Sequence, residues 1–258
     1  NNENTNEDVV VSNIATEIQN RHPLVQEYLG SLAQASSDGF TALNTAFLQD
    51  GAIIHIAKGA TIRRPIHLLF ISTDCHKYAA SYPRTLVIAD EFSRSTIIES
   101  YVSHSDTIHF TNSVTEIELK RNAYVEHYRL LEEGPNGRHV GVARINESDG
   151  STFQSTSFQK STGLARYDLY VKLNGQQSEC ELNGLYLTTD REHVDNFINI
   201  DHVKPHTTSK LYYKGILDGH SRAVFGGTVW VREGAVKTDS QQDDKNLVLS
   251  EHAEVDSK

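Results

Sequence analysis

The stretch Ile54-His-Ile56-Ala-Lys-Gly-Ala60-Thr-Ile62 decides the fold, because its pattern returns later in the chain. Two aliphatic residues flank a polar one, three polar or turn residues follow, and an alanine and a further aliphatic residue complete the unit. Ile117–Val125 and Leu247–Val255 match every position, and Val229–Ala235 matches the first seven. This pattern predicts a strand, a tight turn and a second strand.

The four units begin 63, 112 and 18 residues apart (117 − 54, 229 − 117 and 247 − 229), which are near multiples of roughly 20 residues, the size of solenoid repeats. Stacked units of this kind form a parallel β-helix, because each turn covers a core that it could not bury alone. A β-sandwich is the alternative, since alternating strands joined by turns also describe that fold.

In the β-helix the aliphatic residues before each turn should point into the core, and small alanines should fit the narrow corners. We therefore predict that the core includes Ile56, Leu119, Val231 and Leu249, and the corners Ala60, Ala123, Ala235 and Ala253. Turn residues that tolerate left-handed dihedrals stand just before three of these alanines: Gly59, Asn122 and Gly234.

The rest of the chain divides into three parts. Residues 1–21 begin with the polar run NNENTNEDVV and are expected to be a flexible tail. Residues 22–52 carry two helical patterns, one starting at Pro23 and one after Ser37-Asp38. In the second pattern Phe40, Leu43 and Phe47 recur on one face. Residues 53–258 alternate with period two and are assigned to the β-helix.

Composition excludes several classes of protein. The net charge of −10 (24 Lys and Arg against 34 Asp and Glu) disfavours nucleic acid and anionic membranes as partners. No apolar run approaches the roughly 18 residues of a membrane span, and no signal peptide is visible. Two cysteines are too few for a disulfide framework or an all-thiolate cluster.

The chain has no methionine, so we expect a fragment of a longer protein that continues past Lys258.

His193, Asp195, His202 and His206 are weak candidates for metal ligands, because imidazole and carboxylate bind iron and zinc. The alternative, which we favour, is that they bond to turns or lie on strand surfaces. Their spacing is loose, and a chain with 13 histidines produces such groups readily.

The two cysteines stand in different contexts. Cys180 alternates with Leu182 and is expected to be a buried, inert thiol. Cys75 lies in a polar insertion beside His76, where an exposed thiolate would be reactive.

The acidic run from Asp239 to Asp244 suggests paired carboxylates, as in β-helical polysaccharide-cleaving enzymes. A solvated turn is the favoured explanation. The sequence contains no Walker A loop, no GxGxxG before a helix and no G-x-S-x-G elbow, so no catalytic residue is assigned.

Two long stretches resemble the SufB/SufD family. They are FTALNTAFLQDGAIIHIAKGATIRRPIHLLFIS, from Phe40, and the segment from His193 to Lys258 that contains YKGILDG, SRAVF, KTDSQQ and KNLVLS in the family's order. The segment ALNTAF resembles the SufD branch of the family more closely than the SufB branch. The resemblance implies a mainly β fold, a right-handed parallel β-helix with short N-terminal helices. The chain stops before the family's DDVKC-H segment and helical C-terminal domain.

The resemblance also implies a function. A SufD-like subunit would be a non-catalytic scaffold of the SufBCD complex, which pairs with a SufB-type subunit and a SufC-type ABC ATPase. It would bind no cofactor alone, with an iron–sulfur cluster held transiently in the complex, and would be cytoplasmic, or stromal in a plant plastid. The alternatives are a β-helix polysaccharide lyase or hydrolase and a structural β-helix that self-assembles.

The last predicted unit, Leu247–Val255, should form the subunit interface, because an unpaired strand edge can pair with a strand of another chain. The resemblance places the SufB–SufD contact at the same end. We therefore expect an interface, and possible homodimers of the chain alone, at Leu247, Val248, Leu249, Ala253 and Val255.

Overall fold

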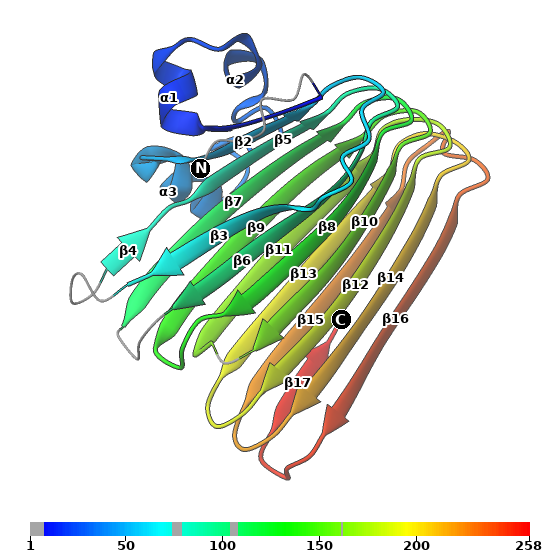
Figure 1. Ribbon diagram of the computed structural model, residues 1–258. Helices are drawn as coiled ribbons and strands as arrows, with labels where there is room; N and C mark the ends of the chain where they lie inside the picture. The colour runs from blue at the N-terminus through cyan, green and yellow to red at the C-terminus, as the bar shows by residue number, and fades with distance from the viewer. Residues whose placement is uncertain (1–7, 74–78, 104–107, 161) are drawn as a thin grey trace.

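The structure, a computed structural model, describes residues 8–73, 79–103, 108–160 and 162–258. These residues form a β-solenoid with two long sheets and three short helices at one end (Figure 1). The expected fold class, a mainly β parallel β-helix with short N-terminal helices, is confirmed, and the β-sandwich is excluded because neighbouring strands from β2 onward run parallel.

Consecutive strands alternate between the sheets along most of the chain, so each turn of the solenoid adds one strand to each sheet. Sheet A contains β1 (Val9–Asn13), β2 (Gly51–Ile56), β4 (Ala79–Ser81), β5 (Arg84–Ala89), β7 (His109–Leu119), β9 (Gly137–Glu147), β11 (Leu164–Leu173), β13 (His193–His202), β15 (Arg222–Val231) and β17 (Glu254–Ser257). Sheet B contains β3 (Ile66–Ser72), β6 (Arg94–Ser103), β8 (Tyr124–Glu132), β10 (Thr152–Lys160), β12 (Glu179–Thr188), β14 (Thr208–Leu217) and β16 (Asp239–Val248).

The structural repeat is longer than the spacing of the sequence units indicated. Ile117 pairs with Ile145, and Val171 pairs with Ile200, so each turn takes roughly 30 residues (145 − 117 and 200 − 171), still within the size range of solenoid repeats. Each turn contains two corners, and both have the form strand, tight turn, strand. The unit at Leu247 belongs to the opposite corner from the other three, which is why the spacing from Val229 to Leu247 misled the estimate of the period.

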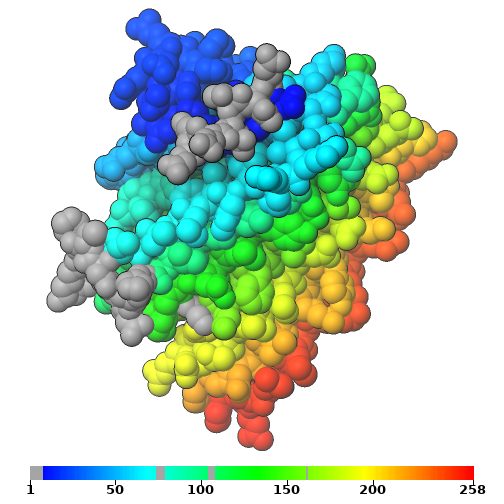
Figure 2. Space-filling view, in the orientation of Figure 1, coloured from blue at the N-terminus to red at the C-terminus, as the bar shows by residue number. Residues whose placement is uncertain are grey.

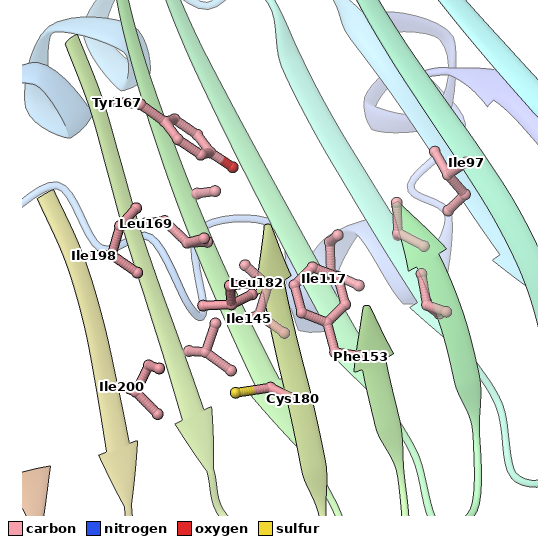
Figure 3. Packing of buried hydrophobic residues seen from close by; sticks show 14 of the residues in the cluster. Ile97, Ile117, Ile145, Phe153, Tyr167, Leu169, Cys180, Leu182, Ile198 and Ile200 are labelled. Carbon is pink, nitrogen blue, oxygen red and sulfur yellow. The ribbon is translucent and has the colours of Figure 1, made fainter. Parts of the chain in front are cut away.

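Between the sheets, one side chain of every two points inward and forms a continuous apolar core (Figure 3). Ile117, Ile145 and Ile200 come from sheet A, and Phe153 and Cys180 face them from sheet B. Stacked strands therefore repeat the same inward position from turn to turn.

The predicted core residues divide into two groups. Ile56 and Leu119 are fully buried, but Val231 and Leu249 are 57% and 59% exposed, so these two predictions are wrong. Val231 stands beyond the part of β15 that β17 covers. In β16 the inward register belongs to Val248, which pairs with the buried Leu217, so Leu249 lies one residue out of that register. The alternation of residues along a strand predicts which way a side chain points. The side chain is buried only where a further turn of the solenoid covers it.

The alanines lie at the corners as predicted, each just after a two-residue turn. Ala60, Ala123 and Ala235 are buried, and Ala253 packs partly buried against the core. The turn residues Gly59, Asn122 and Gly234 have positive φ angles of 74°, 55° and 85°, as their residue types indicate.

The helices α1 (Ile14–Gln19), α2 (Pro23–Tyr28) and α3 (Gly39–Phe47) cover the outer face of sheet A at its N-terminal end (Figure 1). Ile14 and Val25 pack against Leu86 and Ile88 there. Because both faces of β5 are covered, all of its residues are buried. Pro23 begins α2, and Asp38 caps α3 by accepting the Thr41 amide at 2.8 Å, as predicted.

Two expectations about the segment that precedes β2 need correction. Residues 8–21 are not a tail: the β-branched run at Val9–Asn13 pairs antiparallel with β2 and covers that sheet edge, and α1 follows it. The expected tail at residues 1–7 lies outside the described residues. In α3 the buried residues are Thr41 and Asn44, whereas Phe40 and Phe47 are exposed, because Asn44 bonds to the carbonyls of Pro83 and Asn112.

Candidate functional site: the C-terminal edge

The helices and the last strands lie at opposite ends of the solenoid (Figure 2). At the C-terminal end, β16 is the outermost strand of sheet B and β17 the outermost strand of sheet A. β16 pairs along its whole length with β14, whereas β17 pairs only with Arg222–Phe225 of β15. Each strand therefore presents one side of its backbone outward.

Hydrogen bonds show which backbone groups face out. In β16 the Asp239 amide donates to the Thr207 carbonyl at 3.0 Å, and the Leu249 amide donates to the Leu217 carbonyl at 2.8 Å. Successive residues of a strand direct their backbone groups to opposite sides. The amides of the even-numbered residues, including Asn246 and Val248, therefore point away from β14, toward the open edge.

The same reasoning applies to β17. The amides of Glu254 and Lys258 donate to the carbonyls of Ser221 and Phe225, at 3.0 and 2.9 Å. Val255 and Ser257 therefore direct their amides outward. Together, β16 and β17 form what we call the C-terminal edge, residues 239–258, a surface able to pair with an added strand.

Apolar side chains surround this edge. Of the predicted interface residues, Leu247, Val248, Leu249 and Val255 are exposed, and Ala253 is partly buried. The sequence analysis did not include three further exposed apolar residues, Trp230, Val231 and Val236. Their position in the last turn of the solenoid, rather than any local pattern, leaves them uncovered.

Polar side chains occupy inward positions of β16. Asn246 accepts a hydrogen bond from the Tyr186 hydroxyl at 2.5 Å and donates to Asp244 at 2.9 Å. Gly215 and Gly227 leave room for this layer, since a Cβ atom would lie within 2.3 Å of Asn246 and Gln242 respectively. The expectation of a solvated turn at Asp239–Asp244 is therefore wrong. The segment is a strand, and Asp243 and Asp244 point to opposite faces, so they do not form a catalytic carboxylate pair.

The four candidate metal ligands do not form one site. His193 and Asp195 contact each other at 2.6 Å on the same strand face, as their i, i+2 spacing predicts. His202 is buried, and its ring nitrogens bond to Thr207 at 2.7 Å and Ser209 at 2.9 Å. His206 is exposed at a corner with φ of 61°. Within the part of the chain that the structure describes, no three His, Cys, Asp or Glu residues are grouped as metal ligands.

Cys180 is buried in the core beside Phe153, and burial raises the pKa of its thiol. Such a thiol holds its proton and is a poor nucleophile, as expected. Cys75 lies outside the described residues.

A buried polar cluster inside the solenoid was not predicted from the sequence. Glu99 accepts hydrogen bonds from Thr115 and lies 3.2 Å from His127 Nε2. Burial alone would raise the pKa of Glu99, but His127, Thr85 and Thr115 lower it below the usual value. The sequence of β8 could have indicated this cluster. Val125, His127 and Arg129 stand at alternate positions, so His127 and Arg129 share the inward face of the strand with Val125.

Comparison with known proteins defines the class. A model of the SufBD core domain of the SUF system for FeS cluster assembly matches residues 70–258, and a model of the SufBD N-terminal region matches residues 1–68. The chain therefore belongs to the SufBD family of iron–sulfur cluster assembly proteins.

Individual relatives indicate the SufD-like type. SufD of Escherichia coli (strain K12) is 30% identical over 222 residues, covering 85% of this chain and 52% of that protein. A SufBD family protein of Synechocystis sp. is 30% identical over 244 residues, covering 90% and 54%. The chloroplastic protein ABCI7 of Arabidopsis thaliana is 25% identical over 256 residues, covering 96% and 52%. The chain thus spans about half the length of the curated relatives it matches.

Proposed function

We propose that this chain acts as a scaffold in an iron–sulfur cluster assembly complex, in which it pairs with a SufB-type subunit through the C-terminal edge. The observation that carries the proposal is the outward backbone of β16 and β17, flanked by exposed apolar residues, in a SufD-like protein. An added strand would satisfy those backbone groups and cover the apolar residues together. A SufC-type ATPase is the proposed second partner, and it supplies the nucleotide chemistry.

The chain itself is proposed to be non-catalytic and to hold no cofactor alone, with the iron–sulfur cluster bound as cargo by the complex. The separation of His193 from His202 and His206, and the inert environment of Cys180, support this part of the proposal. Polysaccharide cleavage is not favoured, because the neighbouring carboxylates of Asp243 and Asp244 point to opposite faces of β16.

The proposed location is the cytoplasm, or the plastid stroma for a plant protein, in line with the chloroplastic relatives. No helix among the described residues is long and apolar enough to cross a membrane.

Replacing Val248 with proline tests the interface. Proline removes the outward amide but leaves the bonds from β16 to β14 in place, because those use the odd-numbered residues. Val248→Ala is the matched control, since it shortens the same side chain and keeps the amide. We expect Val248→Pro to reduce co-purification with a SufB-type subunit well below the level of Val248→Ala, while circular dichroism shows both variants folded. If a folded Val248→Pro chain binds as well as the parent, the interface lies elsewhere.

A further inference from the structure

A cavity of about 660 Å³ lies at the N-terminal end of the solenoid, far from the C-terminal edge. Its lining residues come from β3 and β6 of sheet B and from β4 and the start of β7 in sheet A. Figure 1 shows these strands at the N-terminal end of the solenoid. Its volume is within the range of small-molecule sites, about 300–1,000 Å³. Neither the metal candidates nor the C-terminal edge contributes to it.

Aromatic rings from both sides line the cavity. Phe70 of β3 stacks on Tyr101 of β6, with ring centroids 4.8 Å apart. Phe47, at the end of α3, stacks on Tyr82 at 5.2 Å, and Phe110 of β7 meets Tyr82 edge-on at 6.2 Å. Phe47 is 56% exposed, so the core does not require it, whereas a ligand at this wall would contact it.

Negative charge accompanies these rings. The described lining contains two acidic residues, Asp50 and Glu133, and no lysine or arginine. Glu133 is 1% exposed and lies 3.3 Å from His139 Nδ1 and 3.4 Å from His109 Nε2. Burial alone would raise the pKa of Glu133, but these histidines lower it, so the carboxyl is ionised. Burial lowers the pKa of His139, which contacts Glu133 in this cluster.

We propose that this cavity binds a small organic cation, held between the aromatic walls with its charge toward Glu133. The π faces of Phe and Tyr attract cations, and the attraction strengthens when water is excluded. A buried carboxylate adds to it, because charges interact more strongly in a low-dielectric interior than in water.

Choline is a suitable probe, and its neutral isostere, in which carbon replaces the quaternary nitrogen, is the matched control ligand. Isothermal titration of the folded chain should show choline binding about tenfold more tightly than the isostere, because the shapes are equal and only the charge differs. Phe47→Ala and Glu133→Gln should each weaken choline binding about fivefold. Trp230→Ala, which truncates an exposed aromatic residue at the opposite end, should leave it unchanged.

Three results would overturn the proposal: no binding of choline, equal binding of the isostere, or choline binding unchanged in Phe47→Ala. Phe47 is exposed, so its truncation should not prevent folding. If Glu133→Gln fails to fold, the isostere comparison and Phe47→Ala decide the outcome.

Discussion

The environment of each residue in this solenoid depends on the face of the strand on which its side chain lies. Cys180 is inert because its inward position surrounds the thiol with core side chains. Gly184 is needed because a Cβ atom there would lie 2.2 Å from the Tyr213 ring. Glu147 also points inward, at the end of β9, and among the described residues its carboxyl accepts a hydrogen bond only from Ser151, at 3.2 Å. Burial raises the pKa of Glu147 well above the usual value, so the folded chain keeps this carboxyl protonated.

Glu147 should make folding stability depend on pH. The unfolded chain loses the Glu147 proton above its ordinary pKa of about 4.3, while the folded chain retains it. The folded state then binds more protons, so stability falls as the pH rises from that value toward the raised pKa. Glu147→Gln removes this titration and can still accept from Ser151.

We expect equal unfolding free energies of parent and variant near pH 4, and a gain for Glu147→Gln on the order of 1 kcal/mol per pH unit above about pH 5. Urea unfolding at several pH values measures this. Parallel stability curves for the two proteins would show that Glu147 titrates normally in the fold.

At the scale of elements, the docking of the N-terminal segment depends on one buried ion pair. Glu116 of β7 accepts the amides of Gly30, Leu32 and Ala33 at 2.9 to 3.0 Å. Arg84 of β5 donates to the same carboxylate at 2.7 Å, and both side chains are at most 1% exposed. Three amides and one guanidinium thus converge on one carboxylate beneath the helices.

Glu116→Gln should destabilise the protein by about 3–5 kcal/mol, because it leaves the Arg84 charge buried without a counterion. The linker between α2 and α3 should also become sensitive to protease. Glu91→Gln is the matched control. It breaks the surface pairs with Lys58 and Arg121 and should leave unfolding almost unchanged. An unfolding midpoint of Glu116→Gln equal to that of the parent would refute this role.

The sequence predicted some of these elements and not others, for physical reasons. The starts of α2 and α3 followed from Pro23 and Asp38, since capping is local chemistry. β1 was missed because its stability comes from pairing with β2, which follows only after all three helices. The part of β16 from Asp239 to Asp244 was taken for a turn because its inward residues are polar, and only the stacked register shows that they lie over Leu211 and Tyr213.

At the scale of the whole molecule, the stacking of parallel strands explains both the buried core and the uncovered C-terminal edge. Each turn buries the turn before it, so the internal strands are covered and the C-terminal edge is not. The sequence predicted the solenoid and most of the exposed residues at this edge, because strand alternation is visible in one chain. It did not predict the turn length or the cavity, since both depend on segments that meet only in the folded protein.

The alternation of backbone groups along β16 provides the most direct test of the proposed partner edge. Hydrogen exchange of this chain, with and without a SufB-type subunit, should be measured at single-amide resolution. We predict that the partner slows exchange at Asn246 and Val248, whose amides face outward, and at Val255 of β17. The amides of Lys245 and Leu247, already directed to β14, should change much less. Equal slowing at odd and even positions, or no slowing within residues 239–258, would contradict strand pairing at this edge.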